Sequence, residues 1–295
     1  MKYFLLFLLA STARAEIKSV YFVSDGVPMH ALLSGDAYLP PALLIHGSPG
    51  RVAQWLPQLQ DSSLIKHYQL IAIDRPGYGE SDTGNAHPAL TVQVDVALAA
   101  LQFNKSNLPI TIVGYSYGGA VAAKLAVDHP NDLARLILLA PAIDPAFELP
   151  RWYENLGDNP IWLWALPTDW QVYLSETMPF SDQLKVLQSQ LSQIHLPIQY
   201  IQGEADTTVS TLTAKFAKDK FTGAKLSVEM IPGMTHAILK ERPDLPTAAL
   251  LSNYPKINHR KRTASYEYPE GNSLEKGLQA DASDSGAIEI GSDQE

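Results

Sequence analysis

The chain has 295 residues, of which 46% are hydrophobic, and a formal net charge of −9 at neutral pH. Residues 264–295 carry −7 of that charge, so the remainder is nearly neutral and offers no basic face to a nucleic acid. The lack of any cysteine excludes disulfides, a lipid-attachment cysteine and a thiol nucleophile.

Residues 1–15 have the features of a secretory signal peptide. Lys2 supplies a positive charge, residues 3–10 form an uninterrupted apolar run, and Ala13 and Ala15 are small residues at the two positions that a signal peptidase inspects. The run is much shorter than the roughly 20 residues that a membrane-spanning helix needs, which disfavours an anchor. The sequence therefore predicts cleavage after Ala15 and export to the periplasm or beyond the cell.

The next part of the chain alternates short apolar runs with helical patterns, which is typical of an α/β fold with a mainly parallel sheet. A leading antiparallel hairpin is predicted around Asp25-Gly26. Runs that are apolar almost throughout predict strands that are buried on both faces. These runs are residues 42–45, 70–73, 110–113, 136–139 and 198–201, and an alternating run at 226–231 predicts a last, edge strand.

Helices are expected on both faces of this sheet, over residues 92–101, 120–128 and 211–218. Residues 142–196 break the rhythm, because they hold four of the five tryptophans and several prolines but no strand-like run. We expect this insertion to form a small helical cap over the carboxyl ends of the strands.

The last part of the chain changes composition once more. Residues 253–295 are rich in Gly, Ser, Asp and Glu and contain few large apolar side chains, which predicts a disordered acidic tail. The predicted organisation is therefore a signal peptide (1–15), an α/β core (16–141 and 197–252), a cap (142–196) and a tail (253–295).

The sharpest motif is Gly114-Tyr115-Ser116-Tyr117-Gly118, which stands between a predicted strand and an Ala-rich helix. In that setting a G-x-S-x-G pattern describes a nucleophile elbow, where the serine backbone takes a strained turn. The glycines are needed because bulky side chains two positions either side of the serine would collide with the neighbouring strand and helix. Ser116 is therefore the candidate nucleophile.

A serine hydroxyl needs a base within hydrogen-bond reach, and the base needs an acid that orients it. His236 lies just past the last predicted strand, where a loop can bring it to Ser116. Asp206 follows the penultimate strand and is the favoured acid, with Glu204 and Asp144 as alternatives.

An oxyanion hole needs two donors that point at the developing negative charge. The backbone N–H of Tyr117 is one candidate, since it heads the helix after the nucleophile. The N–H of Ser48 is the other, in the loop His46-Gly47-Ser48-Pro49-Gly50 after the strand at 42–45.

These motifs, together with Asp74-Arg75-Pro76-Gly77-Tyr78-Gly79-Glu80-Ser81, resemble the α/β-hydrolase family over residues 20–252. The resemblance is to its cap-bearing group of esterases, C–C hydrolases, dehalogenases, epoxide hydrolases and proline iminopeptidases. Since the family's dehalogenases and epoxide hydrolases use an aspartate nucleophile, Ser116 favours acyl transfer to water through an acyl-enzyme. Asp74 and Arg75 are expected to stabilise their turn and not to contact substrate.

The expected function is that of an exported serine hydrolase, which cleaves a carboxylic ester or related acyl bond in a small, largely uncharged molecule, with no metal or organic cofactor. The cap tryptophans would either bind an apolar acyl or alkyl group or form the cap's own core; they are Trp152, Trp162, Trp164 and Trp170.

Other functions stay open. A lactonase or C–C hydrolase would use the same fold, and an aminopeptidase would also need an acidic clamp in the cap. The carboxylates available for such a clamp are Glu148, Glu154, Asp158 and Glu176. A non-catalytic binding protein, using the aromatic cap or the acidic tail, is the alternative of another class.

Overall fold

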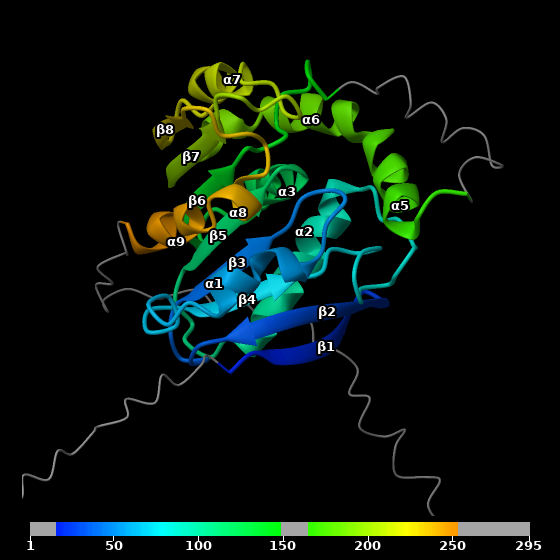
Figure 1. The fold of residues 1–295 in the computed structure, drawn as a ribbon, viewed down its shortest axis with the longest axis vertical. Coiled ribbons are helices and arrows are strands. Elements are labelled where there is room, and N and C mark those ends of the chain that lie inside the picture. Colours follow the sequence, from blue (N-terminus) through cyan, green and yellow to red (C-terminus); the bar gives the residue numbers. More distant parts are fainter. Residues whose placement is uncertain (1–15, 149–164, 253–295) are drawn as a thin grey trace, which may run out of the picture. The chain divides into compact units, whose positions relative to one another are not determined.

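A computed structural model describes residues 16–148 and 165–252 of the chain, all of which belong to one compact unit (Figure 1). The predicted signal peptide and acidic tail lie outside the described residues. Part of the predicted cap, residues 149–164, lies outside them too.

The described strands form one eight-stranded sheet in the order β1-β2-β4-β3-β5-β6-β7-β8. The bounds are Lys18–Ser24 (β1), Val27–Ser34 (β2), Pro41–Ile45 (β3), Gln69–Ile73 (β4), Ile110–Tyr115 (β5), Leu133–Leu139 (β6), Pro197–Gly203 (β7) and Lys225–Ile231 (β8). β2 runs antiparallel to both β1 and β4, and every other pair is parallel. The predicted α/β class with a mainly parallel sheet is therefore confirmed.

The predicted hairpin joins β1 to β2. Asp25 and Gly26 form its two-residue turn with φ of 49° and 82°, both in the left-handed region. Turns of this kind match the twist of the flanking strands, and Asp-Gly is one of the pairs that adopts them at low cost.

Helices cover both faces of the sheet (Figure 1). The α-helices are Leu56–Leu59 (α1), Leu90–Ala99 (α2), Tyr117–Asp128 (α3), Thr168–Thr177 (α5), Phe180–Gln188 (α6), Thr213–Lys220 (α7), Ile238–Glu241 (α8) and Asp244–Leu251 (α9). Short 3₁₀ turns occur at Val52–Trp55 (η1), Ala100–Phe103 (η2) and Leu191–Gln193 (η4). The described part of the 142–196 insertion contains α5, α6 and η4.

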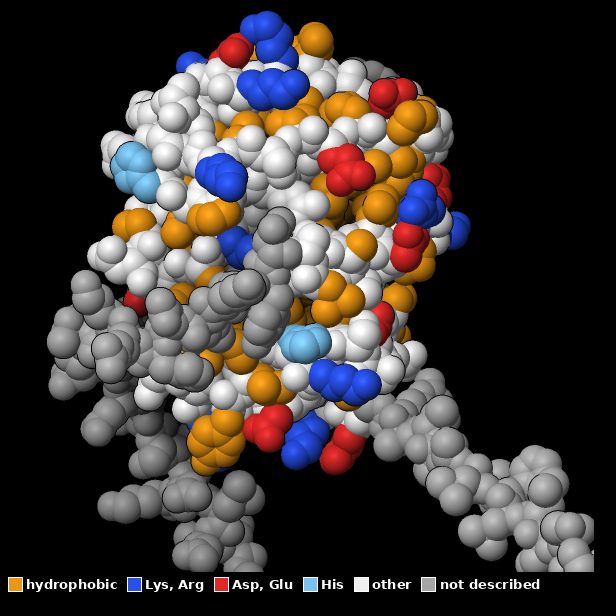
Figure 2. Space-filling model, turned by 90° about the vertical axis from the view of Figure 1, so that its left-hand side faces the viewer, with side chains coloured by type: hydrophobic (Ala, Val, Ile, Leu, Met, Phe, Trp, Pro, Cys, Tyr) orange, Lys and Arg blue, Asp and Glu red, His pale blue; other side chains and the backbone are white. Residues whose placement is uncertain are grey.

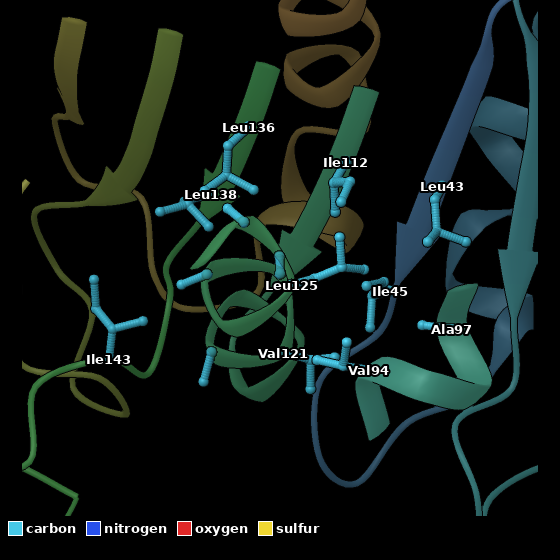
Figure 3. Packing of buried hydrophobic residues seen from close by; sticks show 14 of the residues in the cluster. Leu43, Ile45, Val94, Ala97, Ile112, Val121, Leu125, Leu136, Leu138 and Ile143 are labelled. Atoms are coloured by element: carbon cyan, nitrogen blue, oxygen red, sulfur yellow. The ribbon is translucent and has the colours of Figure 1, made fainter. Parts of the chain in front are cut away.

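The central strands are buried on both faces, and β3 shows how. Leu43 and Ile45 point into one cluster with α2 and α3, where Figure 3 shows Ile45 close to Val94 and Val121. Ala42 and Leu44, the residues between them, point into a second cluster with η1, α8 and α9. Successive side chains of a strand alternate between faces, so a strand with a core on each side must be apolar at every position.

The surface between the elements is mixed in charge. On the face shown in Figure 2, which looks onto the side of β8 and α9, basic and acidic side chains of the described residues are interspersed. Among the helices that the structure describes, none has both the length and the apolar character needed to cross a bilayer.

Candidate active site

Two loops meet at the carboxyl ends of β3 and β5. The order of strands reverses here, because β4 lies on one side of β3 and β5 on the other. In open α/β sheets this reversal leaves a crevice beyond the strand ends. The loop after β3 carries Ser48 and the loop after β5 carries Ser116, and both residues line one pocket.

Ser116 is the single residue between β5 and α3, and its backbone is strained, with φ 54° and ψ −121°. Its N–H donates to the carbonyl of Leu139 at 2.9 Å, and its carbonyl accepts from the N–H groups of Gly119 at 2.8 Å and Ala142 at 3.0 Å. A strained backbone conformation persists where the surrounding structure fixes it. These three hydrogen bonds fix the backbone of Ser116.

The glycines of the motif allow the close packing that this turn requires. A Cβ on Gly114 would lie 2.3 Å from the carbonyl oxygen of Gly118, and a Cβ on Gly118 would lie 2.4 Å from the carbonyl oxygen of Ile45. Gly119 is equally constrained, since its Cβ would lie 2.5 Å from Pro141. The predicted reason for glycine beside the serine is therefore confirmed.

The three residues predicted as nucleophile, base and acid form a hydrogen-bonded chain. His236 Nε2 lies 3.0 Å from Ser116 Oγ, and His236 Nδ1 lies 2.8 Å from Asp206 Oδ2. An ionised carboxylate can only accept, so Nδ1 carries the ring proton and Nε2 is left to accept from the serine hydroxyl.

Asp206 is buried, at 6% exposure, and its loop satisfies it fully. Oδ1 accepts from the N–H groups of Thr208 and Val209, each at 2.9 Å, and Oδ2 also accepts from Gln202 Nε2 at 3.2 Å. Burial alone would raise the pKa of this carboxyl, but the hydrogen bond and charge of His236 and the two backbone donors outweigh it and lower the pKa below its usual value. Asp206 is therefore ionised at neutral pH.

The alternative acids lie elsewhere. Glu204 is exposed on the same loop. Asp144 is buried, and its Oδ1 accepts from the N–H of Ala146 in its own loop at 3.0 Å. Among the described residues, neither carboxylate contacts His236.

Sequence reasoning missed Tyr115, which holds the histidine loop in place. Its hydroxyl donates to the carbonyl of His236 at 2.9 Å, and the two rings stack with centroids 5.3 Å apart. As the variable residue of the G-x-S-x-G motif, it carries no signal of this role in the sequence.

The residues that carry the two candidate oxyanion donors, Ser48 and Tyr117, line the same pocket as Ser116. Among the hydrogen bonds of the described residues, the backbone N–H groups of Ser48 and Tyr117 donate to no protein acceptor. His46 serves as structural support for the loop, because its Nε2 accepts from the N–H of Arg75 at 2.9 Å and its Nδ1 donates to the carbonyl of Gly47 at 2.7 Å. Burial, then the charge of Arg75, keeps the pKa of His46 well below its usual value, so the ring is neutral.

The pocket over Ser116 combines the core with the insertion. The insertion contributes residues from the loop after β6, from α5 and from the start of α6. The lining residues are Ser48, Ser116, Tyr117, Ala142, Phe147, Glu148, Tyr173, Thr177, Phe180, Thr208 and Val209.

Of the four cap tryptophans, which were expected either to bind substrate or to form the core of the cap, only Trp170 is described, and it does not line this pocket. Trp152, Trp162 and Trp164 lie outside the described residues. Trp170 is 44% exposed and packs edge-on against Tyr173, which is itself a lining residue. The described aromatic contacts to the pocket therefore come from Tyr117, Phe147, Tyr173 and Phe180.

Arg75 and Glu176 form an ion pair. Arg75 was expected to stabilise its turn and not to contact substrate, and its guanidinium also reaches Glu176 of α5, with Nη1 2.7 Å from Oε1. Glu176 was a candidate for an acidic clamp, but it is 0% exposed and accepts from Arg75, Tyr78 and Ser48. It cannot bind a substrate amine, because its oxygens are already occupied inside the protein.

Residues 40–166 match the family described as alpha/beta hydrolase fold. A hydrolase of Acinetobacter baylyi, named for (E)-2-((N-methylformamido)methylene)succinate, is 24% identical over 73% of this chain and 91% of its own length. Lipase LipV of Mycobacterium tuberculosis is 36% identical over 40% of this chain, which spans only 43% of that lipase.

Solved structures agree on the fold. The crystal structure of a membrane phospholipase A, described as a bacterial virulence factor, superposes with a TM-score of 0.62. The match covers 81% of this chain and 86% of that one at 22% identity, a level at which the likeness concerns the fold alone.

Proposed function

Because this chain belongs to the α/β-hydrolase family and is a hydrolase, we propose that it cleaves a carboxylic ester, or a closely related acyl bond, through an acyl-enzyme. Ser116 is the nucleophile, His236 the general base and Asp206 the acid that orients the base. The observation that carries this proposal is the chain of two hydrogen bonds that joins the three side chains, 3.0 Å and 2.8 Å long.

Acylation begins when Ser116 Oγ attacks the carbonyl carbon of the ester. The hydroxyl proton moves to His236 Nε2, and Asp206 stabilises the imidazolium that results. The carbonyl oxygen becomes an oxyanion, to which the N–H groups of Ser48 and Tyr117 donate. When the tetrahedral intermediate collapses, the bond to the alcohol oxygen breaks, and the imidazolium gives that oxygen its proton.

Deacylation repeats these steps with water. His236 takes one proton from the water as its oxygen attacks the acyl carbon, and the same two donors hold the second oxyanion. Collapse breaks the bond to Ser116 Oγ, which takes the proton back from His236 and releases the carboxylic acid. Each protein group ends as it began.

The pocket favours an uncharged acyl group. Tyr117, Ala142, Phe147, Phe180 and Val209 contribute apolar side chains to its lining, beside several residues with hydroxyl groups. Among its described lining residues Glu148 is acidic and none is lysine or arginine, so this part of the pocket offers a substrate carboxylate a like charge and no cation. This composition supports an ester and disfavours the dicarboxylic substrate class named for the Acinetobacter relative.

Turnover of graded substrates tests this proposal. We expect p-nitrophenyl esters of unbranched fatty acids to be hydrolysed, with an optimum at a short or medium acyl length, and the same esters of a dicarboxylic half-acid to be hydrolysed at least about tenfold more slowly. Lack of turnover with every ester of the series would contradict the proposal.

An aminopeptidase is the second candidate, because the lining of the pocket includes one acidic residue, Glu148. Amino-acid p-nitroanilides in the same assay distinguish the two. Faster turnover of these anilides than of any ester, and its loss in Glu148→Gln, would assign the enzyme to the aminopeptidases.

We propose that the enzyme is exported, on the strength of the apolar run, the small residues and the positive charge in residues 1–15. N-terminal sequencing of the protein from fractionated cells checks this. The expected mature chain begins at Glu16 and is found in the periplasm or medium, whereas a cytoplasmic chain that retains residues 1–15 would refute export.

A further inference from the structure

An ion pair lies beneath the active site, between the turn after β4 and helix α5 of the insertion. Arg75 and Glu176 are 101 residues apart, and both side chains are 0% exposed. The contact is two-pronged, since Arg75 Nη1 lies 2.7 Å from Glu176 Oε1 and Nη2 lies 3.1 Å from Oε2. Such a geometry fixes the relative orientation of the guanidinium and the carboxylate.

Arg75 contacts the oxyanion loop after β3. Its Nε donates to the carbonyl of His46 at 3.1 Å, and its Nη2 donates to the Ser48 hydroxyl. Ser48 Oγ in turn donates to Glu176 Oε2 at 2.6 Å. The ion pair therefore fixes the side chain of the residue whose N–H is the first oxyanion donor.

Arg75 also contacts the residue that provides the second donor. Its Cζ lies 4.3 Å from the ring centroid of Tyr117, a cation–π geometry. The ring of Tyr117 also stacks on Phe180 at the start of α6, with the two ring centroids 4.4 Å apart. Both oxyanion donors thus belong to residues whose side chains touch one guanidinium.

We infer that Arg75 and Glu176 are positioning residues that set the spacing of the two oxyanion donors, and that the docking of α5 completes the oxyanion hole. This inference rests on the proposed function. Without Glu176 the buried guanidinium has no anionic partner among the residues that the structure describes, and its contacts to the Ser48 loop and to Tyr117 relax together. The insertion then does more than enclose substrate, because it supplies the carboxylate on which the oxyanion hole is aligned.

A purely structural ion pair would behave differently from a positioning one. Replacing a buried pair by apolar side chains of similar volume is often neutral or stabilising, because neither charge then needs to be desolvated. The double variant Arg75→Met with Glu176→Leu should therefore keep the fold and the cap packing while it removes the alignment. The variant Glu176→Gln keeps the volume and the acceptor for Ser48 but removes the charge.

The experiment compares kcat and KM of these two variants with wild type on one p-nitrophenyl ester, well below the Tm of each protein. We expect kcat to fall by about 10- to 100-fold with KM little changed. The fall in kcat should be smaller than the fall caused by removing an oxyanion donor, because these variants displace the donors and do not remove them. The matched control is Asp169→Asn, which breaks the exposed pair of Arg51 and Asp169 between α5 and the core and should leave kcat within about twofold.

Wild-type kcat in either folded variant would overturn the inference, and so would an equal loss of kcat in Asp169→Asn. If the proposed ester hydrolysis is wrong, the wild type itself will be inactive in this assay, and that result differs from the two above.

Discussion

Ser116→Ala is expected to lower kcat for an ester by roughly four to six orders of magnitude, because no other group replaces the attacking oxygen. The Tm should change little, since alanine and serine place the same Cβ on the strained backbone at φ 54° and only one hydroxyl is lost. Turnover of a p-nitrophenyl ester and thermal unfolding of both proteins measure these two effects.

A serine outside the site provides the control. Ser189 is exposed at the end of α6, where its hydroxyl donates to the carbonyl of Val186 at 2.7 Å. Ser189→Ala should keep the wild-type kcat. Ester turnover that survives in Ser116→Ala would remove Ser116 from the mechanism.

Asp206→Asn is expected to lower kcat by about four orders of magnitude at neutral pH while the fold stays intact. An asparagine amide can donate to His236 Nδ1, which moves the ring proton to Nε2, and Nε2 then cannot accept the proton of Ser116. The backbone donors of Thr208 and Val209 can still bond the asparagine oxygen, so the loop keeps its shape. The kcat of the purified variant, together with its Tm, tests this.

The alternative carboxylates serve as matched controls for Asp206. Glu204→Gln changes an exposed residue on the same loop, and Asp144→Asn changes the buried acid after β6. Both variants should retain kcat within a few-fold of wild type. A larger loss in either than in Asp206→Asn would show that the acid has been assigned to the wrong loop.

The sheet was predictable because its central strands have a core on each side. Such strands must be apolar at every position, and the runs at 42–45 and 110–113 therefore stand out in the sequence. Helix α8 was not predicted, since it spans only four residues and leaves too short a periodic pattern.

One part of the candidate site could also be predicted from the sequence and another part could not. The elbow around Ser116 was predictable because a strained strand-to-helix turn needs glycine at fixed positions, and the packing around Gly114 and Gly118 shows that need. The pairing of Arg75 with Glu176 could not be predicted, because it joins residues 101 positions apart. A charged residue also looks the same in a sequence whether it ends up buried or exposed.

Reaction with a fluorophosphonate, followed by peptide mapping, is the sharpest test of Ser116 as nucleophile, because an activated serine attacks the phosphorus of the probe, displaces fluoride and becomes phosphonylated. We expect one adduct on Ser116 in the wild type, none in Ser116→Ala, and slow labelling in Asp206→Asn. A folded wild-type protein that takes no label, or that takes it on another serine, would show that Ser116 is not the nucleophile.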